Sequence, residues 1–184
     1  MSRAATAALT LAQVDLDAGR YTQALESLRM AARSGDGAAL NMLGRCAERG
    51  WGMDPDPAQA AGYYRKAILT GEPWAMFNLA ELHLRGEGVL RDPAAARDLY
   101  AQAARKGLLQ ALNMLGMLAE DEAEARAYFR AGAEGGDPWA MFNHACALAA
   151  DGQQAEARDW IARSRKDAPP GYLAMLDRAR LDWL

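Results

Sequence analysis

Apolar positions at the three- and four-residue spacing of an α-helix alternate along the chain with short stretches rich in glycine, aspartate and proline. One predicted helix runs from Pro73 to about Arg85, with Glu72 before it and Gly86 after it. Proline suits the first helical position because its missing N–H has no partner there, and glycine after a helix readily adopts left-handed backbone angles. The pattern therefore predicts many short helices joined by tight turns.

The pattern recurs with a period of 36 residues. Residues 36–71 and 72–107 align without a gap, and they share the glycines that end helices and the Asp-Pro pairs that begin them. The hexapeptide ALNMLG occurs at 39–44 and again at 111–116. A fixed period of this length is typical of repeat proteins in which each unit is one helix pair.

Further copies are shorter or degraded. The third copy lacks seven residues equivalent to 85–91, and the fourth opens with DPWAMFN, which repeats EPWAMFN with one conservative change. The predicted segments are a leading helix pair at 3–35, repeat 1 at 36–71, repeat 2 at 72–107, repeat 3 with a short loop at 108–136, a degenerate repeat 4 at 137–168, and a capping helix within 169–184. In the last segment Leu173, Leu176 and Leu181 share one side of a helix over 172–184, which favours a cap over a docking peptide.

One helix pair cannot bury its apolar stripes alone, so neighbouring pairs must stack. We therefore expect a single all-α domain, a right-handed α-solenoid of about four helix-turn-helix repeats with capping helices at both ends. Ala39, Ala75, Ala111 and Ala140 recur at the places where helices must cross closely. Such small side chains let helix axes approach to about 8–10 Å.

Composition supports the all-helical prediction. The chain has 42 Ala but only two Val, two Ile and four Thr, so a sheet would have almost none of its usual residues. A net charge of −3 gives no reason to expect nucleic acid, whose binders usually carry a strongly basic face.

The expected compartment is the cytoplasm. No stretch approaches the ~18 consecutive apolar residues of a membrane span. The run of small residues at 4–12 is mostly alanine, which favours an amphipathic helix over a signal peptide, and a periplasmic location is therefore the less favoured alternative. Cys46 and Cys146 form no framework of spaced pairs, and three repeats would place them far beyond disulfide reach.

The repeat resembles the Sel1-like repeat, a bacterial-type relative of the tetratricopeptide repeat. The matching residues in the first unit are Ala39, Leu43, Gly44, Gly50, Gly52, Met53, Ala60, Tyr64, Ala67 and Gly71. Ala80 replaces an expected glycine, and His144 stands where leucine is expected. The resemblance covers about residues 21–168 and implies a non-catalytic adaptor or regulatory scaffold that binds another protein.

No residues combine into a convincing catalytic, cofactor or metal site. The Gly50-Trp51-Gly52 and Gly86-Glu87-Gly88 loops end helices, whereas a phosphate-binding loop would follow a strand and begin a helix. None of the serines lies in a G-x-S-x-G setting. His83 and His144 lie on different helices without a third ligand, so each is expected to be a partly buried imidazole with its hydrogen bonds satisfied.

The remaining candidate is a surface. In tetratricopeptide-like solenoids the first helix of each pair lines the concave face, and residues three and four apart point toward it. The candidate partner-binding residues are Arg45, Arg49, Trp74, Phe77, Glu81, Arg85, Asn113, Met117, Trp139 and Phe142. The alternative is that the rings pack in the seams between repeats. Asn78 and Asn143, one position further round, are expected to make structural hydrogen bonds.

The leading functional hypothesis is a module that captures a peptide or helix of a partner protein, with the Trp and Phe rings as apolar anchors. An inhibitor or immunity-type protein that blocks a partner enzyme is an alternative. An enzyme or small-molecule binder is a minor third. Either a monomer or a weak homodimer is expected, with no cofactor, metal, nucleic acid or membrane as partner.

Overall fold

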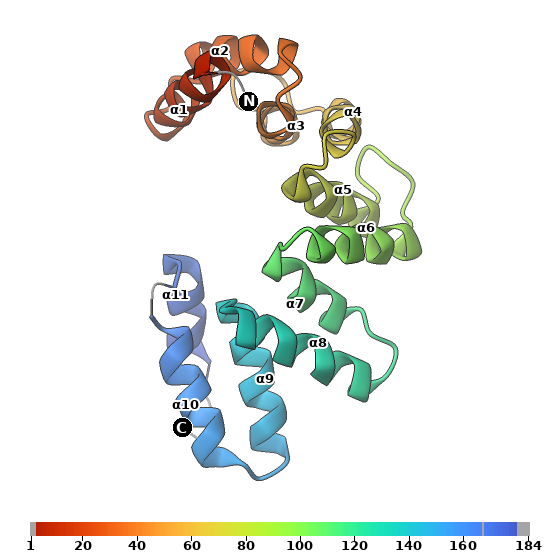
Figure 1. Ribbon diagram of the computed structural model, residues 1–184, viewed down its shortest axis with the longest axis vertical. Helices are drawn as coiled ribbons and strands as arrows, with labels where there is room; N and C mark the ends of the chain where they lie inside the picture. The colour runs from red at the N-terminus through yellow and green to blue at the C-terminus, as the bar shows by residue number, and fades with distance from the viewer. Residues whose placement is uncertain (1–2, 167, 180–184) are drawn as a thin grey trace. The chain divides into compact units, whose positions relative to one another are not determined.

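The computed structural model of the chain describes residues 3–166 and 168–179, with side chains described from residue 6 onward. All regular structure in this part of the chain is helical (Figure 1). The helices are α1 (Arg3–Asp17), α2 (Tyr21–Arg33), α3 (Gly37–Arg49), α4 (Pro57–Ile68), α5 (Pro73–Arg85), α6 (Pro93–Arg105), α7 (Leu109–Met117), α8 (Glu122–Gly135), α9 (Pro138–Ala150), α10 (Gln154–Ser164) and α11 (Pro170–Arg178). The all-α prediction is confirmed.

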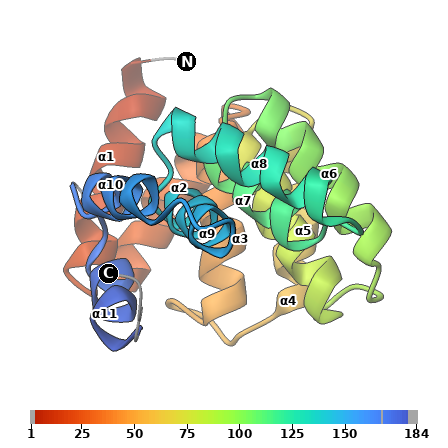
Figure 2. The same cartoon turned by 90° about the horizontal axis from the view of Figure 1, so that it is seen from below.

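The helices form two compact units, Met1–Lys106 and Gly107–Leu184. In the first unit, each helix from α1 to α5 packs against the next one along the chain. In the second unit, α7 packs against α8, and α9 packs against α7, α8 and α10; Figure 2 shows α9 flanked by α8 and α10. Each unit is a stack of helix pairs, which is the architecture of an α-solenoid.

Aspartate caps begin five of the described helices, and in three of them the aspartate belongs to an Asp-Pro pair of the kind predicted to begin helices. Each accepts a hydrogen bond from the backbone N–H three residues later. The capping residues are Asp36, Asp56, Asp92, Asp121 and Asp137. At the other end, Gly50 and Gly86 follow α3 and α5 with φ values of 73° and 71°, the left-handed conformation that glycine adopts without strain. Local sequence therefore sets where these helices begin and end.

The core of the first unit consists of alanines packed around a few large side chains. Tyr64 is fully buried between α3, α4 and α5, in a cluster that includes Leu79 and Leu82. Gly44 of α3 leaves room for the Tyr64 ring, since a Cβ there would lie 2.3 Å from Cε1. Small residues in the helix contacts thus let bulky aromatic rings enter the seam.

The last helix covers the α9–α10 pair. Tyr172 and Leu176 of α11 are buried in one cluster with Ala145 and Ile161. The Tyr172 hydroxyl donates a hydrogen bond to Ser164 Oγ at 2.6 Å. This helix begins two residues before the predicted span of 172–184 and ends at Arg178; Leu181 lies outside the described residues.

Candidate functional site

The first helices of consecutive repeats lie side by side within each unit. α3 contacts α5 in the first unit, and α7 contacts α9 in the second. A pair of asparagine side chains joins each set: Asn78 Nδ2 donates to Asn41 Oδ1 at 2.8 Å, and Asn143 Nδ2 donates to Asn113 Oδ1 at 2.8 Å. The structural role predicted for Asn78 and Asn143 is confirmed.

Asn113 is a predicted partner contact, but the structure buries it. Its side chain is occupied by Asn143, so it has little surface to offer another protein. The prediction treats every third or fourth position as exposed, whereas this position turns toward the neighbouring first helix. Met117, one turn later on α7, is well exposed.

A network of charged residues crosses the first unit near the ends of α3 and α5. The Arg85 guanidinium pairs with Glu48 at 2.7 Å, with Glu87 at 2.9 Å and with Glu81 at 3.4 Å. Arg85 is therefore bound within its own unit rather than free to pair with a partner, and the network carries more negative than positive charge.

Two buried tyrosines donate hydrogen bonds to glutamates of this network. Tyr64 donates its hydroxyl hydrogen to Glu48 Oε2 at 2.8 Å, and Tyr100 donates to Glu81 Oε1. Burial, followed by the hydrogen bond to the glutamate, raises the pKa of both phenols, so both stay protonated and act as donors. The tyrosines thus fix the carboxylates that Arg85 bridges.

The predicted aromatic anchors divide into exposed and packed rings. The exposed fraction is 42% for Trp74 and 38% for Trp139, which occupy matching repeat positions. Phe77 is half-buried, with its ring centroid 5.7 Å from that of Trp74 and 5.1 Å from that of Tyr100. Phe142 is half-buried against the cluster beneath α11. The tryptophans are partly accessible, although each also packs on another ring, Trp74 on Phe77 and Trp139 on the buried Tyr172 at 5.1 Å. The phenylalanines largely support the core.

Arg45 and Arg49 are exposed on α3, and Arg45 belongs to an aromatic cluster that the repeat pattern did not predict. The Tyr21 and Trp51 rings lie nearly parallel with centroids 6.2 Å apart, and the Arg45 guanidinium lies 5.6 Å from the Trp51 centroid. Repeat alignment could have suggested this contact, since Trp51 lies in a loop that returns to the preceding helix pair.

The two histidines differ in how well they are satisfied. His83 Nδ1 lies 3.2 Å from the Leu90 carbonyl oxygen, as expected of a half-buried imidazole with a partner. His144 is only 9% exposed, and its Nδ1 is buried with no hydrogen-bond partner. The expectation of a satisfied imidazole is therefore wrong for His144, and burial, as the largest cause, lowers its pKa.

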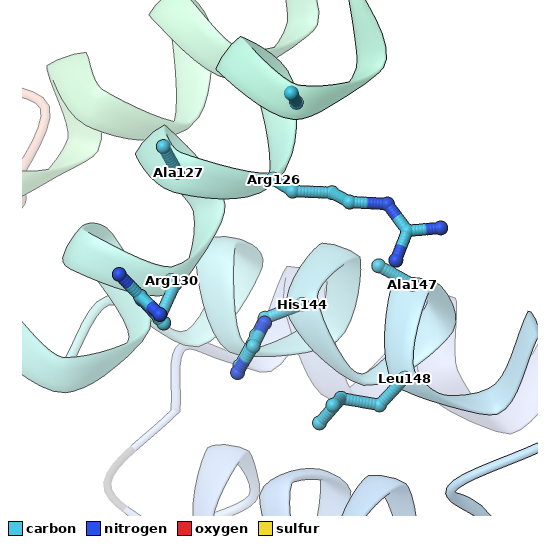
Figure 3. Close-up of a pocket in the computed structure, with 7 residues that line it drawn as sticks. Arg126, Ala127, Arg130, His144, Ala147 and Leu148 are labelled. Atoms are coloured by element: carbon cyan, nitrogen blue, oxygen red, sulfur yellow. The ribbon is translucent and has the colours of Figure 1, made fainter. Parts of the chain in front are cut away.

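His144 lines a pocket of about 330 Å³ between α8 and α9 in the second unit. Figure 3 shows Arg126 and Arg130 extending from α8 on either side of His144 in this view, with Ala147 and Leu148 on α9. No residue of this pocket was among the predicted binding residues, because its shape depends on how two helices pack.

The cysteines are free thiols, and burial raises the pKa of Cys46 to about 11. Cys46 is thus poorly suited to act as a nucleophile. Among residues 3–166 and 168–179, no three His, Cys, Asp or Glu side chains gather in a way that would hold a metal ion. Within the same ranges, no helix combines the length and apolarity needed to cross a membrane.

The profile of the Sel1 repeat matches three segments, residues 37–71, 75–108 and 110–137. The chain belongs to the Sel1 repeat family. These three Sel1 repeats coincide closely with predicted repeats 1, 2 and 3. The α9–α10 pair lies outside the match, but it forms a helix pair and opens with Asp-Pro-Trp, which corresponds to Glu-Pro-Trp in repeat 2.

Several solved bacterial structures are similar to this Sel1 repeat chain. A Sel1 repeat protein from Oxalobacter formigenes is 23% identical with a TM-score of 0.73, over 86% of this chain and 68% of that one. The protective antigen c5321 of uropathogenic Escherichia coli is 27% identical with a TM-score of 0.68, over 86% of this chain and 36% of that longer one. The immunity protein Pa5087 from Pseudomonas aeruginosa is 20% identical with a TM-score of 0.67, over 94% of this chain and 75% of that one. No curated protein matches the sequence.

Membership of the Sel1 repeat family indicates the general role of such a surface. Sel1 repeats are generally non-catalytic modules that bind other proteins. Trp74 and Trp139 lie outside the three matched segments, but they occupy matching positions of the chain's own repeat, and they are the exposed rings of the predicted surface.

Proposed function

We propose that the chain is a non-catalytic module that binds a helix or extended peptide of a partner protein on the first-helix surfaces of its repeats. The observation that carries the proposal is the exposure of Trp74 and Trp139 at matching positions. Tryptophan is strongly enriched among residues that dominate protein-binding energy, and here a partly exposed ring recurs at the same position of two repeats.

Charged residues on α5 and on the neighbouring α3 would orient the partner. Glu81 and Arg85 lie on the same helix as Trp74, and Arg45 and Arg49 lie on α3, which packs against that helix. Because Arg85 already pairs with three glutamates, basic residues on the partner are the better match near this network. Charges at the rim of an interface mainly set orientation and association rate.

The test compares Trp74→Ala, Trp139→Ala and the double variant with wild type in affinity capture from the native cell, followed by mass spectrometry. Leu90→Ala is the control, because Leu90 is a large apolar residue that is almost fully exposed in the loop after α5, whereas Trp74 lies at the start of that helix. A hot-spot ring contributes at least about 2 kcal/mol, so each tryptophan variant should weaken binding of a captured protein by roughly thirty-fold.

Measurements of helicity and melting temperature show whether a loss of capture comes from the changed surface or from unfolding of the variant. Helicity should stay close to wild type in the tryptophan variants, and the melting temperature should fall only modestly, since each ring is partly solvent-exposed and packs on one neighbouring ring. Unfolding of both single variants would instead show that these rings belong to the core. If the folded double variant captures the partner as well as wild type does, the tryptophans are not part of the interface.

An inhibitor or immunity-type role is the alternative form of the same binding activity. One solved neighbour is named as an immunity protein, but at 20% identity that likeness concerns the fold alone. Co-expression with the product of the neighbouring gene separates the two roles. An inhibitor would suppress an activity of that product, whereas an adaptor would leave the activity intact and change its location or partners.

A further inference from the structure

The seam between α8 and α9 corresponds in the repeat to the seam between α4 and α5, but it is filled differently. In the α4–α5 seam, Leu79 and Leu82 are buried in one apolar cluster. The same repeat positions on α9 hold His144 and Ala147. Replacement of leucine by alanine removes side-chain volume, and the imidazole brings a polar group into a place that is apolar in the other seam.

The loop that follows α5 also has no full counterpart after α9. The α5–α6 loop passes so close to the start of α4 that a Cβ on Gly88 would lie 2.3 Å from the Ala58 nitrogen, and Val89 packs on the apolar cluster. The α9–α10 connection consists only of residues 151–153. No side chain from it takes the place of Val89 in the pocket lining, and the pocket of about 330 Å³ lies in this seam.

One of the two arginines in the pocket is neutralised within the protein. Arg126, which stands at the repeat position of the fully buried Ala61, bonds to Glu122 at 2.6 Å and to Asp151 Oδ1 at 3.1 Å. The hydrogen bond from Arg126 lowers the pKa of Asp151, so the pair stays charged. Arg126 therefore forms a wall of the pocket rather than a free cation.

The other polar groups are less fully engaged. Arg130 lies 3.9 Å from Glu134, with both side chains 65% exposed, and a pair of this kind holds its partners weakly. His144 contacts Trp160 edge to face at 5.3 Å, and its Nδ1, which is shielded from solvent, has no hydrogen-bond partner. Glu134 on α8 and Glu156 on α10 are the carboxylates close enough to act on this imidazole.

We propose that this pocket binds the carboxylate of a small ligand that carries a short apolar tail. The carboxylate would pair with Arg130 and accept a hydrogen bond from His144, while the tail would pack against Ala147 and Leu148, which line the rest of the pocket with Ala123 and Ala127. This proposal is independent of the proposed protein-binding function, because it uses none of the residues of the first-helix surface.

The charges favour a monoanion over a phosphate. Only Arg130 offers a loosely held positive charge in the pocket lining, and the glutamates at positions 134 and 156 would repel a dianion. A volume of about 330 Å³ lies at the lower end of the range of small-molecule pockets, which suits a compact ligand.

The two histidines of the chain make a direct test possible. Hexanoate is titrated into the full-length protein while the imidazole resonances of His83 and His144 are followed by NMR, and hexanamide serves as the uncharged control ligand. The expected result is a saturable shift of the His144 resonance with hexanoate, in the millimolar range, and little change at His83. The His144 pKa should rise when the carboxylate is bound, because a nearby negative charge favours the imidazolium.

Two variants locate the binding site. Arg130→Gln, at an exposed position, should weaken hexanoate binding about tenfold, as expected for the loss of one charge-assisted hydrogen bond. Ala147→Leu places in the pocket the side chain that fills the other seam, and it should abolish the shift while leaving all charges in place. If Ala147→Leu fails to fold, Arg130→Gln still decides the question.

The proposal is overturned if hexanoate produces no saturable shift at His144, if hexanamide binds as tightly, or if Arg130→Gln binds hexanoate as tightly as wild type. A second experiment asks whether the natural carboxylate is a protein C-terminus or a free organic acid. It compares a hexapeptide that ends in leucine with a free C-terminal carboxylate and the same peptide with an amidated C-terminus. Tighter binding of the free peptide than of hexanoate indicates a protein C-terminus, and the reverse order indicates a free organic acid.

Discussion

The side-chain amide of Asn78 donates a hydrogen bond to Asn41 Oδ1 at 2.8 Å and so joins the first helices of two consecutive repeats. Asn143 and Asn113 make the same bond at 2.8 Å in the second unit. Both acceptors are buried, so each bond satisfies a polar group that has little access to water. The repeated pair sets the register of neighbouring first helices.

Loss of this bond should cost stability. Asn78→Ala leaves the Asn41 amide buried without its partner, so the free energy of unfolding should fall by about 1–3 kcal/mol. Urea denaturation followed by circular dichroism measures the change, with Gln102→Ala on exposed α6 surface as the control. Equal stability of the two variants would show that the amide pair contributes nothing.

Substitution of Gly44 should be destabilising because the Tyr64 ring packs directly against it. An alanine Cβ would lie 2.3 Å from Tyr64 Cε1, and Tyr64 is fully buried, so Gly44→Ala should destabilise the protein by about 1–3 kcal/mol. Gly62→Ala is a matched control, since a Cβ at this position would meet no atom within 4 Å and alanine favours a helix by up to about 1 kcal/mol. Thermal melts should therefore shift in opposite directions for the two variants.

Much of the fold could be predicted because its signals are local. Asp92 and Pro93 begin α6, and Gly86 ends α5, through contacts with their own backbone neighbours. The exposure of the rings was harder to predict, because three residues advance about 300° around a helix. Phe77 is therefore rotated from Trp74 by about 60°, enough to turn it toward Tyr100.

The pocket could not be predicted from local patterning. The His144 position was recognised as a departure from leucine, but the space around it depends on the small size of Ala147 on the same helix, on the α8 side chains across the seam and on the short connection that follows α9. The size of this space depends on residues from two helices and a loop, and a periodic pattern along one helix cannot predict it.

Acid should destabilise the protein partly through His144. Burial lowers the pKa of His144 below its ordinary value of 6.5, so the unfolded chain takes up this proton at a higher pH than the folded chain. Stability should therefore fall as the pH drops through about 6.5, with a contribution no steeper than about 1.4 kcal/mol per pH unit for one proton.

His144→Leu removes this contribution, and chemical denaturation at a series of pH values measures it. The difference in unfolding free energy between the variant and wild type should grow as the pH falls from about 7 to about 5. Arg130, Glu134 and Glu156, which act on the imidazole, are present in both proteins and largely cancel in the difference. A difference that does not change with pH would contradict the prediction.

Filling the α8–α9 seam should stabilise the fold. Ala147→Leu adds apolar side-chain volume next to an existing cavity, and cavity-filling changes commonly add about 0.5–2 kcal/mol. Ala150→Leu, at an exposed position one turn later on α9, is the control for the general effect of leucine in this helix. A lower melting temperature for Ala147→Leu than for the control would show that the seam has no room for the side chain.

The pocket between α8 and α9 depends on the length of the loop after α9 as well as on the residues of the helices. Loops between repeats tolerate insertion at small cost, because closure entropy grows slowly with loop length. Transfer of the α5–α6 loop, residues 86–92, into the place of residues 151–153 would bring a valine over this seam. A helical array can thus gain or lose a cavity by changing a surface loop, while every helix keeps its place in the stack.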